Sequence, residues 1–239
     1  MFEQKEDLVI TDPLKNVGSN FQDKLPVVIS IGLDETVKTF NHIQLSRLQC
    51  WENLLIKINP KNQKNHSEKL SLMFPLMESK NLDGKYKNTL EQARQNVNLA
   101  LNHDYQFSLS DLKDRITQSV FNQDWNEVDW AKFWIKEFSR VLGYNQENCQ
   151  LTKLHEYLQQ KNLKVIFLMD GLENIFLDLA YDTCQQTALK ALIDNLPNKL
   201  TEIKQSNLGL IVFLHRDSLR KTIKQNSGQF ESLYSEYRF

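Results

Sequence analysis

The sequence of 239 residues is poor in the residues that build cross-linked or metal-stapled proteins. It has three cysteines, Cys50, Cys149 and Cys184, which are odd in number and far apart. This pattern excludes a disulfide framework and a paired-cysteine zinc site, and it predicts reduced thiols in a cytoplasmic protein. The five histidines show no metal-ligand spacing either, so we expect neither metal–thiolate nor histidine-pair chemistry.

The chain also lacks a strong charge of either sign and a long apolar run. Its net charge of −1 gives no indication of a nucleic-acid partner or of an acidic membrane surface. The first seven residues are acidic and lack the apolar core of a signal peptide. No apolar run approaches the length that spans a bilayer, so we expect no membrane contact. The length and the ordinary composition indicate one sizeable globular domain.

Three short apolar runs are present, and each is followed by polar or charged residues. Residues 27–31, 165–169 and 208–214 have the length and composition of buried strands. Asp170 directly follows the second run, at the strand end where open α/β sheets bind their ligands. A carboxylate in this place typically holds a metal ion or polarises water, and Glu173 adds a second acid. The alternative is a strand that simply ends at a polar turn.

The first run leads into a partial phosphate-binding motif. The pattern G-x-x-x-x-G-K-[ST] is matched at Gly32, Lys38 and Thr39 with its spacing intact, whereas Val37 replaces the second glycine. In this motif backbone N–H groups and a helix N-terminus surround the phosphates, the lysine reaches the β- and γ-phosphates, and the hydroxyl binds Mg²⁺. A helix is predicted from Phe40, where apolar residues begin to recur at three- and four-residue spacing.

Val37 is the main departure from the motif. It places a branched side chain where the backbone must approach a phosphate, and it disfavours any positive φ needed there. Asp34 and Glu35 also bring negative charge to a site meant for an anion. A working phosphate site and a degenerate one both fit this sequence.

The middle of the chain, residues 61–162, is predicted to be mainly helical and polar, with Pro75 interrupting it. Its clearest helix follows Asp124, which has capping-box spacing to Glu127. Trp130 and Trp134 belong to the apolar face of this helix. We expect that face to point into the core, the alternative being a partner-binding surface.

The third apolar run is followed by Arg216. A cation at this strand end, on the same edge as Lys38 and Asp170, can sense or stabilise a γ-phosphate. Arg220 and Lys224 would share a helical face with Arg216, so a solvated basic face is the alternative.

These features together resemble the core of a P-loop NTPase. The segment Leu168-Met169-Asp170-Gly171-Leu172-Glu173 is similar to the Walker B motif of the STAND class, notably the NACHT and KAP ATPases, in which a small residue follows the metal-associated aspartate. Arg216 after an apolar strand is similar to their sensor arginine. The resemblance covers about residues 26–59 and 164–225, and the family continues into a helical lid where this sequence stops.

The resemblance implies a role for each matching residue. Lys38 would bind phosphate together with the loop from Gly32 to Thr39, while Thr39 and Asp170 would be associated with Mg²⁺. Glu173 would polarise water and Arg216 would sense the γ-phosphate. The expected cofactors are therefore ATP and Mg²⁺.

The predicted fold is α/β, a three-layer P-loop NTPase-like parallel sheet with a large helical insertion. The single domain would comprise a lead-in segment (1–25), the phosphate-loop strand and helix (26–59), the helical insertion (60–163) and a Walker B and sensor half (164–239). The expected function is an ATP- and Mg²⁺-binding regulatory switch with weak or absent hydrolysis, whose partners are nucleotide and other protein subunits or domains. The alternatives are a degenerate NTPase kept as a protein-interaction scaffold, and a helical adaptor without a parallel sheet.

Overall fold

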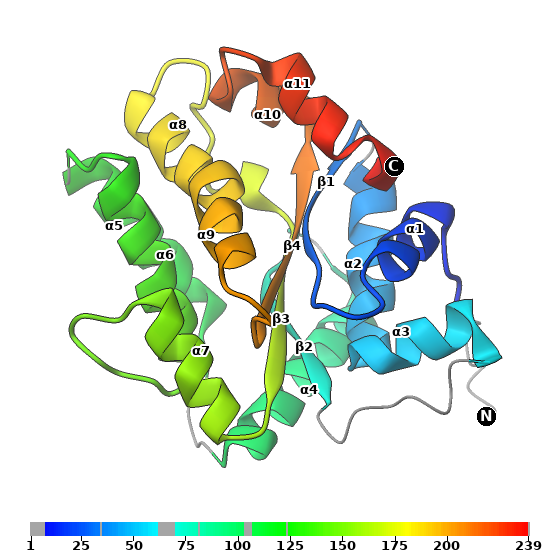
Figure 1. Cartoon of the computed structure of the whole chain (residues 1–239). Helices are drawn as coiled ribbons and strands as arrows, with labels where there is room; N and C mark the ends of the chain where they lie inside the picture. Colours follow the sequence, from blue (N-terminus) through cyan, green and yellow to red (C-terminus); the bar gives the residue numbers. More distant parts are fainter. Residues whose placement is uncertain are drawn as a thin grey trace.

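A four-stranded parallel sheet forms the centre of the protein. The computed structural model describes residues 8–33, 35–61, 70–80, 82–102, 107–122 and 124–238, without the side chains of residues 35, 36 and 122. Within these ranges the strands lie in the order β1-β4-β3-β2 (Figure 1), with bounds β1 (Val27–Gly32), β2 (Ser71–Met77), β3 (Lys164–Met169) and β4 (Leu208–His215). Each neighbouring pair is parallel, which confirms the α/β class and excludes the helical adaptor.

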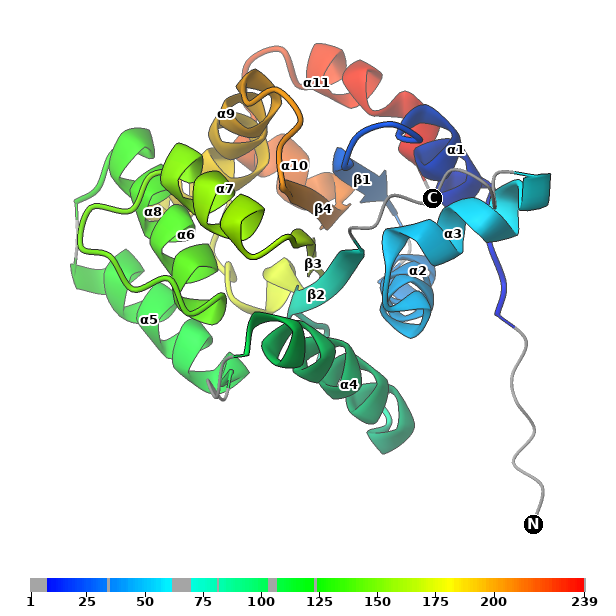
Figure 2. The same ribbon diagram turned by 60° about the horizontal axis from the view of Figure 1, so that its bottom comes forward.

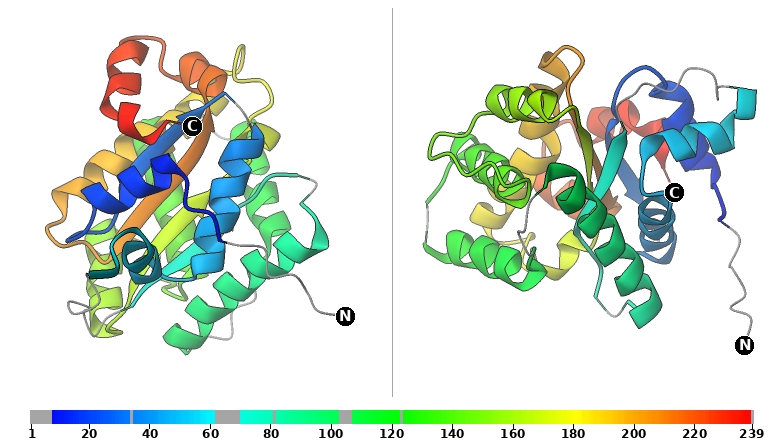
Figure 3. Two further views of the ribbon diagram at one scale, coloured as in Figure 1. Left: turned by 90° about the vertical axis from the view of Figure 1, so that its right-hand side faces the viewer. Right: turned by 90° about the horizontal axis from the view of Figure 1, so that it is seen from below.

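Helices cover both faces of this sheet, as the view along it shows (Figure 3, right). Their bounds are α1 (Asp12–Asn20), α2 (Glu35–Leu48), α3 (Trp51–Ile58), α4 (Gly84–Leu101), α5 (Leu109–Asn122), α6 (Glu127–Val141), α7 (Leu151–Gln160), α8 (Thr183–Lys190), the π-helical segment η3 (Ala191–Asn195), α9 (Leu196–Glu202), α10 (Arg216–Thr222) and α11 (Ser227–Leu233). Two short 3₁₀ turns, η2 (Leu172–Asn174) and η4 (Ser235–Tyr237), complete the described elements.

The two faces bury separate apolar clusters, because successive strand residues point to opposite sides. On one face, side chains such as Val28, Ile166 and Phe213 pack against α1, α2 and α3. On the other, Phe167 and Leu210 belong to a larger cluster that includes residues of α4 to α11. Helix α4 lies along the β2 edge and contacts both β2 and α2 (Figure 2).

The strands predicted at residues 27–31, 165–169 and 208–214 are confirmed, but the prediction that residues 61–162 are mainly helical is wrong for β2. Residues 71–77 are buried throughout and pair with β3, so part of the expected insertion 60–163 belongs to the central sheet. Pro75 does not end this strand, because β2 lies at the sheet edge, where a missing N–H is tolerated. Its outward carbonyl accepts a hydrogen bond from Arg94 Nε at 2.8 Å.

Three helix predictions need correction. The lead-in segment contains α1, whose Leu14 and Val17 are buried in the core, and Pro13 stands in its first turn. The helix predicted from residue 40 to residue 58 is divided into α2 and α3 by Gln49, which has φ of 64°. Helix α6 is capped by Asn126 and not by Asp124, since the Asn126 side chain accepts from two backbone N–H groups of the first turn.

The tryptophan-rich face of α6 points into the core, as predicted. Trp130 and Trp134 are fully buried, and Trp134 donates its indole N–H to the Ala188 carbonyl at 3.0 Å. None of the helices in the described ranges has the length and apolar character needed to cross a membrane.

Candidate functional site

The carboxyl ends of the four strands bring most of the predicted site residues to one edge of the sheet. Gly32 ends β1 and pairs in register with His215, the last residue of β4. Asp170 follows β3, whose last residue pairs with Val212. Asp170 is thus level with Phe213 of β4, and Arg216 lies three positions farther along the chain; all of these residues lie on the edge where parallel sheets bind ligands.

The segment expected to form a phosphate loop is mostly helical. Helix α2 begins at Glu35, so Val37, Lys38 and Thr39 lie inside the helix and the link to β1 is only two residues long. Val37 is not among the residues with positive φ, so the strain expected there does not arise. The prediction of an eight-residue loop is wrong in this respect; the N–H groups of the first turn of α2 are the donors available to an anion. Asp34 lies outside the described residues.

Thr39 and Asp170 contact each other, although they are far apart in the chain. The Thr39 hydroxyl donates to Asp170 Oδ2 at 2.7 Å. Ser79, two residues beyond the end of β2, donates to the same oxygen at 2.7 Å, and its hydroxyl lies 2.9 Å from that of Thr39. The three oxygen atoms thus form a compact cluster, which we call the oxygen triangle.

Lys38 precedes Thr39 in α2 and is fully buried, with 0% of its surface exposed. Its Nζ has no hydrogen-bond partner within the described part of the chain, and the same is true of Asp170 Oδ1, although Asp170 is 1% exposed. Buried charged and polar atoms without partners are costly and rare in native proteins. Both atoms therefore have unused hydrogen-bonding capacity, which fits the groups that ATP and Mg²⁺ would require.

His42 follows Lys38 by one helical turn and is also fully buried. Neither ring nitrogen has a hydrogen-bond partner among the described residues, and the ring packs edge-on against Phe213 at 5.9 Å between centroids. Burial lowers the pKa of His42 to about 4; the charge of Arg94 acts in the same direction, while Asp170 and Glu78 oppose it. The imidazole is therefore neutral at physiological pH.

The ends of β2 and β3 approach closely because Gly171 follows Asp170. Gly171 has φ of 74°, and a Cβ built there would lie 2.6 Å from the Glu78 carbonyl oxygen. The Asp170 N–H donates to the Met77 carbonyl at 3.2 Å. The glycine therefore allows the approach that brings Ser79 to Asp170.

The other two predicted residues are arranged differently. Glu173 lies half-buried in η2, three residues after Asp170. Arg216 donates twice to Glu231 Oε2 of α11, at 3.0 and 2.8 Å, and this pairing holds the pKa of the Glu231 carboxyl below its usual range. The structure therefore brings Thr39 and Asp170 together, and it places the Arg216 guanidinium against α11.

Ser79 is the site residue that sequence reasoning missed. A hydroxyl residue two positions after an apolar run is a recognisable signal, since Ser79 follows the end of β2 at the edge where Asp170 follows β3. Because Pro75 predicts a break in the pattern, the sequence alone does not reveal β2 or its polar end.

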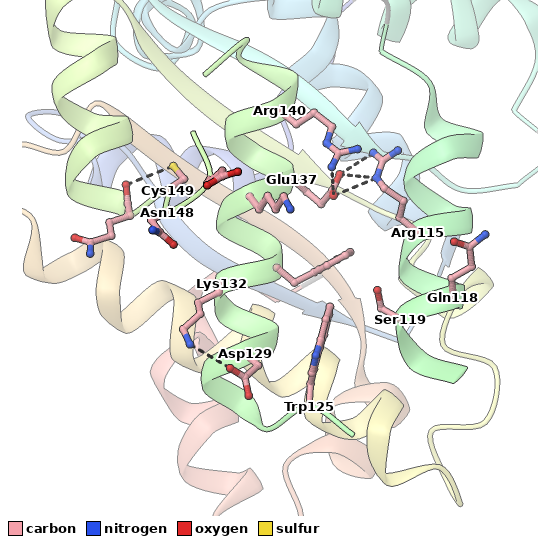
Figure 4. Close-up of a pocket in the computed structure, with 14 residues that line it drawn as sticks. Arg115, Gln118, Ser119, Trp125, Asp129, Lys132, Glu137, Arg140, Asn148 and Cys149 are labelled. Carbon is pink, nitrogen blue, oxygen red and sulfur yellow. Dashed lines mark hydrogen bonds and ion pairs between the residues drawn. The ribbon is translucent and has the colours of Figure 1, made fainter. Parts of the chain in front are cut away.

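A separate groove of about 790 Å³ lies between α5, α6 and the segment before α7 (Figure 4). Trp125 and Phe133 contribute apolar surface to it. The buried Glu137 accepts from Arg115 at 2.7 Å and pairs with Arg140 at 3.7 Å, so the two arginines are already engaged. The groove shares no residue with the oxygen triangle.

Known proteins add nothing to this geometry: no family model, curated protein or solved structure matches the chain. Across the described ranges, no group of three or more His, Cys, Asp or Glu side chains is placed to hold a metal ion. Any cation at the sheet edge would therefore depend on hydroxyl oxygens and on a ligand of its own, as Mg²⁺ does with phosphates.

Proposed function

We propose that this chain is an ATP- and Mg²⁺-binding domain of the P-loop NTPase type, related to the STAND and KAP ATPases, that acts as a regulatory switch with weak or absent hydrolysis. The observation that carries the proposal is the 2.7 Å hydrogen bond between Thr39 and Asp170, the two residues assigned to Mg²⁺. They stand 131 positions apart in the chain, and nothing local in the sequence requires them to meet.

The buried ammonium of Lys38 supports the same function. A lysine buried without a partner is unfavourable in the free protein, and such strained groups are concentrated at ligand sites. In this proposal Lys38 binds the β- and γ-phosphates, and the N–H groups of the first turn of α2, next to Gly32, bind phosphate oxygens. Thr39 and Asp170 hold Mg²⁺, which supplies charge neutralisation to the phosphates.

The remaining residues have conditional roles. Glu173 polarises water if hydrolysis occurs. Arg216 senses the γ-phosphate only after it leaves Glu231, so a nucleotide-dependent movement of α10 against α11 is the form that the switch would take. Other protein subunits or domains are the expected partners, and they would respond to that movement. The cysteine content predicts that this happens in the cytoplasm.

Calorimetric titration with ATP in the presence of Mg²⁺ tests the proposal on the full chain. Thr39→Val keeps the shape of the side chain and removes its oxygen, so we expect at least tenfold weaker binding. Thr187→Val is the matched control, because Thr187 is also a helical threonine and its hydroxyl donates to the Thr183 carbonyl of its own helix. Equal affinity in the parent and both variants would remove the assigned roles.

Lys38→Met is a second test, in which stability and ATP binding are expected to change in opposite directions. Removing a buried ammonium that lacks a partner is expected to raise the free energy of unfolding by about 1–3 kcal/mol, measured by urea denaturation. The same change is expected to abolish ATP binding, because the charge that meets the phosphates is gone. A variant that is less stable than the parent, or that binds ATP equally well, would contradict the role of Lys38.

The early start of α2 favours a second candidate, a degenerate NTPase domain kept as a protein-interaction scaffold. With Val37 inside a helix, only two positions separate β1 from α2, and the oxygen triangle is closed on itself. This candidate predicts no ATP binding by the parent and recovery in Val37→Gly, which loosens the start of the helix. Tight ATP binding by the parent would exclude it.

A further inference from the structure

Ser79 completes a set of three oxygen atoms contributed by three different segments of the fold. Thr39 comes from α2, Asp170 follows β3, and Ser79 follows β2 at the sheet edge. The Ser79 hydroxyl lies 2.7 Å from Asp170 Oδ2 and 2.9 Å from Thr39 Oγ1. It therefore contacts both residues that the proposed function assigns to Mg²⁺.

As a Mg²⁺ ligand Asp170 would be ionised, and the oxygen triangle then has three close contacts but only two hydroxyl protons. An ionised carboxylate donates no proton, and each hydroxyl donates one. If Thr39 and Ser79 both donate to Asp170 Oδ2, no proton is left for the 2.9 Å contact between the two hydroxyl oxygens. Two oxygen atoms then face each other with lone pairs only, which favours a positively charged group at this point.

The spacing of the oxygens also fits a small divalent cation. Mg²⁺ binds oxygen ligands at about 2.0–2.1 Å in octahedral geometry, so neighbouring ligand oxygens stand about 2.9 Å apart. The three separations of 2.7, 2.7 and 2.9 Å are close to the edges of one face of such an octahedron. Asp170 Oδ1, buried and without a partner among the described residues, is a further oxygen beside this face.

The backbone around Ser79 is held in place. Glu78, its neighbour, pairs with Arg94 of α4 at 2.6 Å, and Gly171 admits the β2 end against β3. The contacts that hold the backbone next to Ser79 also hold its hydroxyl near Asp170, as precise metal binding requires.

We infer that Ser79 supplies a third protein oxygen to the Mg²⁺ site, beside Thr39 and Asp170. The inference rests on the proposed function, since the remaining ligands of the cation would be phosphate oxygens and water. Ser79 thus makes nucleotide binding depend on the end of β2, a strand that carries no part of the recognised motifs.

Calorimetric titration of the full chain with ATP, in excess Mg²⁺ and again in EDTA, tests this inference. Ser79→Ala is expected to weaken binding about tenfold in Mg²⁺ and to leave binding in EDTA unchanged. Ser71→Ala is the matched control: Ser71 donates to the Glu52 carboxylate at 2.7 Å and begins β2, at the opposite end of the strand from Ser79. The control is expected to bind like the parent in both solutions.

A metal exchange separates ligation from simple positioning. Ser79→Cys replaces a hard oxygen by sulfur, so Cd²⁺ in place of Mg²⁺ is expected to restore ATP affinity in this variant and not in Ser79→Ala. An equal loss with and without metal, or recovery by neither cation, would mean that Ser79 only supports the local structure and would overturn the inference.

Failure of the inference and failure of the proposed function are distinguishable. ATP binding by the parent together with unchanged binding by Ser79→Ala would overturn only the role of Ser79. Absence of ATP binding by the parent would overturn the proposed function, and the Mg²⁺ role of Ser79 with it. Urea denaturation of each variant shows that any loss of binding does not come from unfolding.

Discussion

His42, on the buried side of α2, makes the stability of the fold depend on pH. Its ring is fully buried and, within the described ranges, both nitrogens lack hydrogen-bond partners, while burial lowers its pKa to about 4. In the unfolded chain a histidine has a pKa of about 6.5, so the unfolded state takes up the proton first as the pH falls. The stability contributed by neutral His42 is therefore present above about pH 6.5 and is lost as the pH falls toward 4.

This asymmetry predicts the behaviour of His42→Leu, which keeps an apolar side chain of similar size beside Phe213. Between pH 6.5 and 4.5 the parent is expected to lose about 2 kcal/mol more free energy of unfolding than the variant. Urea denaturation at a series of pH values measures the difference, and the other titrating groups cancel because both proteins share them. Parallel stability curves for the two proteins would show that His42 is not buried in the neutral form.

At the scale of single residues, the sequence predicted two partners of the oxygen triangle and missed the third. Thr39 and Asp170 belong to motifs with fixed spacing, so they could be found by pattern. Ser79 belongs to no motif, and its role depends on the pairing of β2 with β3, which only the folded chain shows. The burial of Lys38 could not be predicted either, because lysine is almost always solvent-exposed.

Among the elements, the pairing of β2 and β3 depends on Gly171. A side chain there would be forced into a left-handed conformation and would meet the Glu78 backbone oxygen at 2.6 Å. Gly171→Ala is therefore expected to lower the free energy of unfolding by about 2–4 kcal/mol, measured by urea denaturation. It is also expected to weaken ATP binding, because it separates Ser79 from Asp170.

Gly84 provides the comparison for this prediction. It opens α4, and nothing lies within 4 Å of a Cβ built on it. Gly84→Ala is expected to leave stability unchanged or to raise it by about 0.5–1 kcal/mol, since alanine favours a helix. Similar losses in both variants would contradict the close approach at Gly171.

Strands and helices differed in how well the sequence predicted them. The strands at 27–31, 165–169 and 208–214 are continuous apolar runs, typical of parallel strands buried on both faces. Residues 71–77 form an equally apolar strand, but proline is usually excluded from strand interiors, and only its place at the edge explains Pro75. The early start of α2 has no such sequence signal, because Thr36, Val37 and Thr39 are β-branched and favour a helix less than most residues.

The molecule as a whole protects both edges of its sheet. The β1 edge is covered by the C-terminal turn, where Ser30 donates to the Tyr237 carbonyl at 2.7 Å and Asn16 of α1 donates to the Glu236 carbonyl at 2.9 Å. The β2 edge is covered by α4, whose Arg94 bonds to Pro75 and Glu78. Covered edges reduce the risk of pairing with other chains.

Arg94→Met tests the protection of the β2 edge. Arg94 and Glu78 side chains are 8% and 12% exposed, so removing one partner leaves a nearly buried charge, with an expected cost of about 3–5 kcal/mol. The double variant Arg94→Met, Glu78→Gln removes the unpaired charge and is expected to recover most of this loss in urea denaturation. A double variant as unstable as the single one would show that packing, and not charge pairing, holds α4 on β2.

The oxygen triangle joins α2 to the ends of β2 and β3. Its two bonds to Asp170 come from Thr39, 131 positions away in the chain, and from Ser79, 91 positions away. A ligand that binds all three residues would act as a reversible cross-link, since unfolding any one of these segments would require its release. At a free concentration one hundred times its dissociation constant, such a ligand adds about 2.7 kcal/mol to the stability of the whole fold. Occupancy of the triangle by such a ligand would then also slow proteolysis, because cleavage proceeds through opened states of the chain.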